Sequence, residues 1–158
     1  METLKLGIVG AGFITRFQSR AIAQIRNMEI AGITSRTKAH AEDVAKEIRE
    51  MGIGEAVVYD TVEEMANHVD AIAIYSPNFT RIEIMEKIVD AVKKGANLKG
   101  VICEKPLGRN MKEARRLVEL ADEANLRTAY FENQIFMKPI QSQLAQLKKK
   151  KKTMGPLV

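Results

Sequence analysis

The chain has 158 residues, 46% of them hydrophobic and 28% charged, which fits one domain built around a single core. Its one cysteine, Cys103, excludes an intrachain disulfide, and with only two histidines a four-ligand structural zinc site is not expected. The net charge of +5 comes from five consecutive lysines at 148–152; since the rest of the chain carries 20 basic and 20 acidic residues, nucleic-acid binding is not expected.

Short apolar runs alternate with amphipathic stretches, which is typical of an α/β fold with a mostly parallel sheet. The apolar runs predict six strands, at residues 4–9, 29–34, 56–59, 69–74, 101–103 and 127–131. The stretches between them predict five helices, at residues 13–25, 38–51, 61 onward, 78–94 and 110–124, and a last helix follows at 139–147. This order predicts a doubly wound, six-stranded Rossmann NAD(P)-binding fold over residues 1–140.

Three polar residues are expected to mark helix ends. Thr61 stands three residues before Glu64, and Asn110 stands three residues before Glu113, which is the spacing of an N-terminal capping box. Asn125 is expected to end the fifth helix in a left-handed conformation.

A G-x-G motif lies where the first strand turns into the first helix. Gly10 permits the tight turn, and Gly12 lets the backbone approach a pyrophosphate. The first helical amides, at Phe13 and Ile14, then offer free N–H groups and the positive end of the helix dipole to the phosphates. Thr15 replaces the third glycine of the fingerprint, a position that serves helix–strand packing. The alternative is a turn in which glycine serves geometry only, but the place in the first βαβ unit favours dinucleotide binding.

The end of the second strand carries no carboxylate, although NAD-specific domains place Asp or Glu there to hold the ribose 2′-hydroxyl. Ser35 and Arg36 stand there instead. A hydroxyl and a guanidinium suit the 2′-phosphate of NADP, which a carboxylate would repel. We therefore predict NADP as the preferred cofactor. The alternative is use of both NAD and NADP, with Arg36 stacking on the adenine.

Two further motifs follow later strands, namely Tyr75-Ser76-Pro77-Asn78 after the fourth and Glu104-Lys105-Pro106-Leu107 after the fifth. Together with the glycine loop, they make the chain similar to the N-terminal domain of the Gfo/Idh/MocA family (glucose–fructose oxidoreductase and inositol dehydrogenase) over residues 4–140. All three motifs follow the carboxyl ends of parallel strands, where ligands bind in such sheets. The resemblance implies that Ser76, Pro77 and Asn78 contact the cofactor on its nicotinamide-ribose side.

The resemblance also implies roles for two charged residues. Lys105 is placed beside the nicotinamide and the reacting carbon, and Glu104 holds ribose hydroxyls or supports the lysine. Hydride transfer at a carbon that bears a hydroxyl needs a group that polarises the oxygen, which an ammonium can do. Lys105 is therefore the catalytic candidate, and the implied substrate is a small sugar, cyclitol or related polyol. An ordinary charged loop is the alternative.

Two positions depart from the family pattern. Arg81 stands near the place of a common histidine, and the sequence after the sixth strand, Glu132-Asn133-Gln134, replaces a usual arginine. Asn133 is expected to hydrogen-bond the carboxamide or, like Gln134, a substrate hydroxyl. Capping of the strand end is the equal alternative.

Family members carry a second α/β domain, which supplies a further acid–base residue, much of the substrate pocket and the main oligomer interface. We expect residues 141–158 to hold a helix end, the lysine tract and the start of a link to such a domain, and the chain to be a truncated product. A truncated chain exposes the surface that this domain covers, so homo-oligomers are expected. The alternatives are a separate partner chain, or a non-catalytic NADP-binding sensor or subunit.

No segment has the features of a membrane span or an export signal. No apolar run reaches the roughly 18 residues that span a bilayer, and the acidic start, at residues 1–3, leads straight into a strand. We therefore expect a cytoplasmic protein with no membrane contact. The lysine tract is interpreted as a solvated helix end, with a polyanion-binding tail as the alternative.

Overall fold

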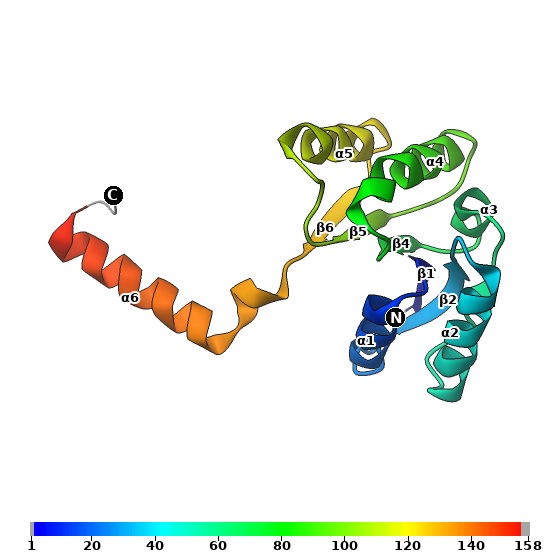
Figure 1. Ribbon diagram of the computed structural model, residues 1–158, viewed down its shortest axis with the longest axis horizontal. Coiled ribbons are helices and arrows are strands. Elements are labelled where there is room, and N and C mark those ends of the chain that lie inside the picture. Colours follow the sequence, from blue (N-terminus) through cyan, green and yellow to red (C-terminus); the bar gives the residue numbers. More distant parts are fainter. Residues whose placement is uncertain (1, 156–158) are drawn as a thin grey trace.

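Six parallel strands form one sheet in the computed structural model, which describes residues 2–155 of the chain (Figure 1). The strands are β1 (Leu4–Val9), β2 (Met28–Thr34), β3 (Val57–Val58), β4 (Ala71–Ile74), β5 (Gly100–Glu104) and β6 (Arg127–Phe131). Their order across the sheet is β3-β2-β1-β4-β5-β6, and every neighbouring pair is parallel. This is the strand order of the dinucleotide-binding fold, so the predicted fold class is confirmed.

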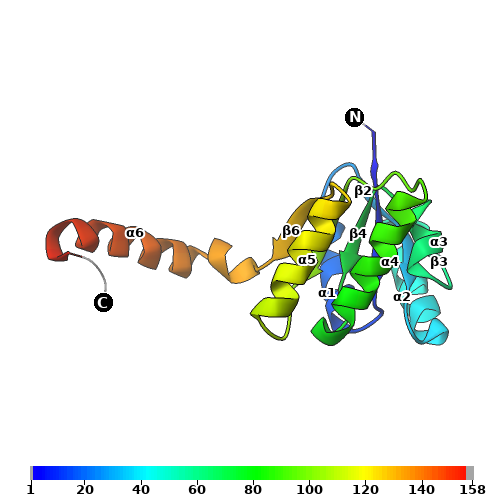
Figure 2. The same cartoon turned by 90° about the horizontal axis from the view of Figure 1, so that it is seen from above.

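Helices cover both faces of the sheet. On one face lie α1 (Phe13–Ile22) and α2 (Lys38–Glu50), and on the other lie α3 (Val62–Ala66), α4 (Arg81–Lys93) and α5 (Met111–Glu123) (Figures 1 and 2). Two 3₁₀ turns, η1 (Asn78–Thr80) and η2 (Asn133–Phe136), precede α4 and α6 (Lys138–Met154), respectively. Helix α6 extends away from the sheet beyond β6 (Figure 2). None of the described helices is long and apolar enough to cross a membrane.

The core consists of two apolar clusters, one on each side of the sheet. Strand β4 contributes to both, because its side chains alternate between the two faces. Ala71 and Ala73 pack toward α1 and α2, whereas Ile72 and Ile74 pack toward α3, α4 and α5. All four are buried, as expected for a parallel strand that helices cover on both faces. The carboxyl end of this strand is therefore a fixed point for the loop that follows it.

The expected helix ends are present. Thr61 Oγ1 accepts a hydrogen bond from the Glu64 N–H at 3.1 Å, and Asn110 Oδ1 accepts one from the Glu113 N–H at 3.0 Å. Asn125 follows α5 with a φ of 51°, in the left-handed region. The local polar signals therefore place the starts of α3 and α5 and the end of α5.

Several predicted boundaries differ from the structure. The third strand is only two residues long, because Ala56 has a φ of 43° and is not extended. The predicted helix at 78–94 begins as η1, and its α-helical part starts at Arg81. The last helix is longer than predicted and runs to Met154. Residues 156–158, which hold part of the expected link, lie outside the described residues.

Asp70 ties together the amino ends of three strands, at the sheet edge opposite to the strand ends that the motifs follow. Its Oδ2 accepts a hydrogen bond from the Lys5 N–H at 2.8 Å, and its Oδ1 lies 2.6 Å from Lys99 Nζ. The hydrogen bond from Lys99, assisted by the Lys5 amide, lowers the pKa of the Asp70 carboxyl below its usual value. The carboxylate therefore stabilises the fold in its charged form.

We expect Asp70→Asn to lower the stability at neutral pH by no more than about 1 kcal/mol, because solvent screens the exposed Lys99. A depressed folded-state pKa means that the contribution is fully present above the unfolded pKa of about 4 and is lost as the pH falls through the folded value. Urea unfolding of both proteins between neutral and strongly acidic pH measures this. The stability difference should shrink on acidification, and Lys99→Met should behave in the same way. A difference that is constant across this range would contradict the role of Asp70.

Candidate functional site

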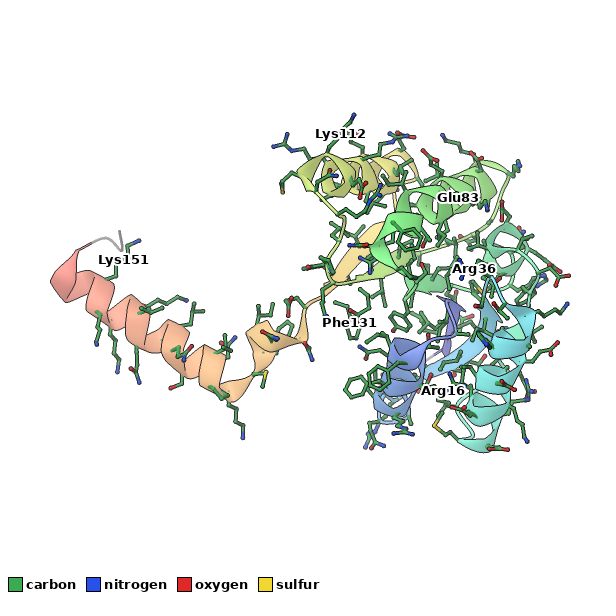
Figure 3. All side chains as sticks on the ribbon, viewed as in Figure 1. Arg16, Arg36, Glu83, Lys112, Phe131 and Lys151 are labelled. Carbon is green, nitrogen blue, oxygen red and sulfur yellow. The ribbon has the colours of Figure 1, made fainter. Side chains whose placement is uncertain are left out.

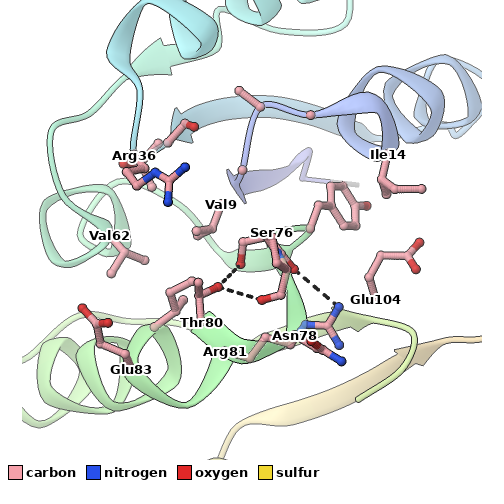
Figure 4. A pocket seen from close by; sticks show the side chains of 18 of the residues that line it. Val9, Ile14, Arg36, Val62, Ser76, Asn78, Thr80, Arg81, Glu83 and Glu104 are labelled. Carbon is pink, nitrogen blue, oxygen red and sulfur yellow. Dashed lines mark hydrogen bonds between the residues drawn. The ribbon is translucent and has the colours of Figure 1, made fainter. Parts of the chain in front are cut away.

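A cavity of about 1040 Å³ opens at the carboxyl ends of β1, β2, β4 and β5 (Figure 4). This is the edge at which ligands bind in doubly wound sheets. The predicted site residues that line it are Gly10, Gly12, Phe13, Ile14, Ser35, Arg36, Ser76, Pro77, Asn78, Glu104 and Lys105. The fold thus brings together side chains from four separate loops.

The glycine loop leaves the start of α1 open toward this cavity. Gly10 has a φ of 111°, and a Cβ on it would lie 3.0 Å from the Ser76 nitrogen, so a side chain there would strain the loop. A Cβ on Gly12 would meet nothing within 4 Å, because this position faces open space. Helix α1 begins after Gly12 without a side-chain cap and without an acidic residue in its first turn. Its first amides, at Phe13 and Ile14, are therefore suited to an anionic ligand such as a pyrophosphate.

Thr15, at the position of the third fingerprint glycine, is fully buried. Its Oγ1 donates a hydrogen bond to the Gly10 carbonyl oxygen at 2.7 Å. The hydroxyl therefore connects the first turn of α1 to the glycine loop. This departure from the glycine pattern adds a hydrogen bond that stabilises the loop.

The turn after β2 forms the opposite end of the cavity. Ser35 is half-buried and Arg36 is exposed, with the guanidinium on the same side of the cavity as Val62 (Figure 4). Asp60 also lines this end, and its Oδ1 lies 2.6 Å from Lys38 Nζ. Because the Asp60 carboxylate is already paired with Lys38, the Arg36 guanidinium can bind a phosphate at this end of the cavity.

Glu104 is almost fully buried, with 6% of its surface exposed. Its Oε1 accepts a hydrogen bond from Gln18 Nε2 at 3.2 Å, and its Oε2 accepts one from the Lys105 N–H at 2.9 Å. The carboxylate therefore contacts the backbone of Lys105. The Lys105 side chain itself is exposed and lines the cavity.

Arg81 is the first residue of α4, and only 2% of its surface is exposed. Its guanidinium donates hydrogen bonds to the carbonyl oxygens of Pro106, Leu107 (3.2 Å) and Ser76 (3.5 Å). Burial lowers the pKa of Arg81, whereas Cys103 and Glu104 raise it. The arginine thus lies between the loops that follow β4 and β5.

The sequence reasoning did not identify Gln18 and gave Arg81 no role. A signal for Gln18 was present, because Thr15, Gln18, Ser19 and Ile22 share one face of α1 at helical spacing. Polar residues on the face of a helix that is otherwise suited to the core indicate buried partners. For Arg81 the sequence alone shows only an arginine near the start of a helix, which gives no such signal.

The cavity lining includes neither Asn133, a predicted site residue, nor Cys103. Asn133 is exposed at the start of η2 and is not among the described residues that line the cavity; Glu132 Oε1 accepts a hydrogen bond from the Gln134 N–H at 3.1 Å and caps this turn. Burial raises the pKa of the Cys103 thiol to about 11, which fits a small core residue better than a reactive thiol. Within residues 2–155, no three His, Cys, Asp or Glu side chains gather as metal ligands would.

The comparisons with known proteins agree with this fold. The family model of the Gfo/Idh/MocA proteins, described as an oxidoreductase family with an NAD-binding Rossmann fold, matches residues 4–132. The uncharacterized protein YMR315W of Saccharomyces cerevisiae is 33% identical over 162 residues, which cover all of this chain and 43% of that protein. An inositol 2-dehydrogenase of Paracoccus denitrificans is 32% identical over 130 residues, which cover 79% of this chain and 35% of that enzyme.

A solved structure gives the same result. UDP-N-acetylglucosamine 3-dehydrogenase GnnA of Acidithiobacillus ferrooxidans superposes with a TM-score of 0.74 at 25% identity, over 92% of this chain and 44% of that one. The chain therefore spans less than half the length of each of these three proteins.

Proposed function

Because this chain belongs to the Gfo/Idh/MocA oxidoreductase family, whose matching part is an NAD-binding Rossmann fold, we propose that it is the NADP(H)-binding part of a dehydrogenase. Its reaction would be hydride transfer between the nicotinamide and a carbonyl or secondary alcohol of a sugar or polyol. The observation that carries this proposal is one cavity that is lined by the uncapped start of α1, by Arg36 and by Lys105. Names of relatives, such as inositol 2-dehydrogenase, support the substrate class.

The preference for NADP rests on the turn after β2. Ser35 offers a hydroxyl and Arg36 a guanidinium to a ribose 2′-phosphate, and this turn carries no carboxylate. The nearby Asp60 faces Lys38, so it is already paired with a cation. NAD remains the alternative cofactor, since the family model is described as NAD-binding.

We expect Arg36→Ala to weaken NADPH binding by about 10- to 100-fold and to change NADH binding by less than about threefold, because only NADPH carries the phosphate. Isothermal titration calorimetry of both cofactors measures this. Arg49→Ala, which removes an exposed arginine on α2, is the control and should change neither affinity. Equal or tighter binding of NADH by the unaltered chain would contradict the NADP preference, and binding of neither cofactor would contradict the proposed function.

Catalysis in this proposal depends on Lys105. The bound cofactor supplies or accepts the hydride. The Lys105 ammonium donates a hydrogen bond to the substrate oxygen and favours the negative charge that develops there. Glu104 stays buried, accepts the Lys105 N–H and orients the loop from which the lysine projects. The relatives extend well beyond the region that matches this chain. We propose that further substrate contacts come from a region like the unmatched part of those relatives.

We expect Lys105→Met to lower turnover by about 10²- to 10⁴-fold while cofactor affinity changes by less than about threefold, because the lysine acts on the substrate oxygen. The measurement is NADPH oxidation with a panel of ketoses and inosose-type ketones, with and without candidate partner proteins. Lys112→Met is the control, since Figure 3 places this exposed lysine on α5, away from the cavity. Undiminished turnover of Lys105→Met would contradict its role. Cofactor binding without turnover under any condition would favour a non-catalytic cofactor-binding module.

A further inference from the structure

The buried guanidinium of Arg81 connects two loops of the cavity. Ser76 follows β4, and Pro106 and Leu107 follow β5; all three offer carbonyl oxygens to the same side chain. Strands β4 and β5 are parallel neighbours, with Ile74 opposite Cys103, so their loops leave the sheet side by side. Figure 4 shows Arg81 at this junction, with a dashed line from its guanidinium toward Ser76.

Lys105 is fixed on both sides along the chain. On its amino side, Glu104 accepts the Lys105 N–H and is itself held by Gln18 from α1. On its carboxyl side, the next two carbonyl oxygens bind Arg81. The backbone that carries the exposed lysine is therefore anchored to α1 through a carboxylate and to α4 through a guanidinium.

An arginine is suited to this place because its planar fork carries five N–H donors that reach several acceptors at once. The acceptors here are neutral carbonyl oxygens. Their dipoles stabilise the positive charge of the Arg81 guanidinium, which is almost entirely buried. The Glu104 carboxylate adds an attractive charge. A lysine ammonium is a compact charge that cannot span the three acceptors in one geometry.

We infer that Arg81 is a positioning residue, which holds the Lys105 loop against the Ser76–Asn78 loop and so shapes the nicotinamide end of the cavity. This inference rests on the proposed function, in which Lys105 faces the nicotinamide. It assigns no chemical step to Arg81. Since the hydrogen bonds of the Arg81 side chain in the described structure go to the loops after β4 and β5, binding of the adenine and pyrophosphate should not depend on it.

The test combines hydrogen exchange with binding of two nucleotides to the full chain. In Arg81→Lys we expect the amides of Lys105, Leu107 and Gly108 to exchange about tenfold faster, because restraining hydrogen bonds are lost. Affinity for the preferred nicotinamide dinucleotide should fall about tenfold, whereas affinity for ADP, which carries no nicotinamide, should change by less than about twofold. Arg81→Met keeps the aliphatic stem and removes every donor. It should speed amide exchange and weaken dinucleotide binding more than Arg81→Lys does, again with the smaller change in ADP affinity.

Arg109→Lys is the matched control, because Arg109 lies on the same loop but pairs with Glu113 at an exposed site. It should change neither loop exchange nor dinucleotide affinity. Unchanged exchange at residues 105–108 in both Arg81 variants would overturn the inference, and so would an equal loss of ADP and dinucleotide affinity, which would indicate a general effect on the fold. If the unaltered chain binds no nucleotide while the exchange still rises, the proposed function fails and the anchoring of the loop by Arg81 stands.

Discussion

Replacing Gly12 by aspartate is expected to weaken the binding of NADPH and NADH by at least about a hundredfold, which is about 2.7 kcal/mol, without lowering the free energy of unfolding. The new side chain enters open space, because a Cβ at Gly12 meets nothing within 4 Å. The backbone there is extended, with φ −94° and ψ −167°, and Gly12 is the N-cap of α1, where aspartate is a favoured residue. The same carboxylate would occupy and repel the proposed phosphate position.

Calorimetric titration and urea unfolding of the same preparations measure the two effects separately. Gly12→Ala is the matched control, because it adds the Cβ without the charge, and its loss of affinity should be clearly smaller. Retention of dinucleotide affinity by Gly12→Asp would place the ligand away from the start of α1. A large loss of stability would show instead that Gly12 serves only the local turn.

Gly54→Ala is expected to destabilise the fold by about 3–5 kcal/mol, more than a typical substitution. Gly54 has a φ of 141°, and its Cβ would lie 2.3 Å from the Ile30 carbonyl oxygen and 2.7 Å from the Ile30 nitrogen. Both atoms are bonded in the sheet region, since the Ile30 N–H donates to Ile53 and the Ile30 carbonyl accepts from Ala56. The added methyl group therefore has to displace β2 or break its contacts with the segment before β3.

Gly52→Ala separates this clash from backbone strain. Gly52 also has a positive φ, 67°, but a Cβ on it meets nothing within 4 Å, so we expect a loss of only about 1–2 kcal/mol. Urea or thermal unfolding at neutral pH compares the two variants directly. Equal losses would mean that β2 adapts to the methyl group and that the close approach at Ile30 contributes little.

The parts of the structure that the sequence predicted are those with local signals. Apolar runs marked the six strands, and Thr61 and Asn110 marked two helix starts through a cap that forms within one turn. The site motifs were predictable because each directly follows a strand, and parallel strands bring their carboxyl ends to one edge. In such a fold, a residue that directly follows a strand in the sequence can therefore be placed at the ligand-binding edge of the sheet.

The parts that were not predicted depend on contacts between distant segments. Gln18 and Glu104 are 86 positions apart, and Arg81 and Pro106 are 25 apart. Their partners are known only when the packing of α1 and α4 on the sheet is known. The short β3 has a similar cause, since the left-handed Ala56 is held by a backbone hydrogen bond to Ile30 and not by a preference of alanine.

The Thr15 hydroxyl has a consequence for how such domains are recognised. A pattern search that requires three glycines scores this loop as degenerate and ranks the chain below proteins with the full fingerprint. Yet the threonine donates to the Gly10 carbonyl oxygen, which a third glycine cannot do, and it has a higher helix propensity than glycine. Small hydroxyl residues at this position therefore merit the same weight as glycine when genomes are screened for nicotinamide-binding chains.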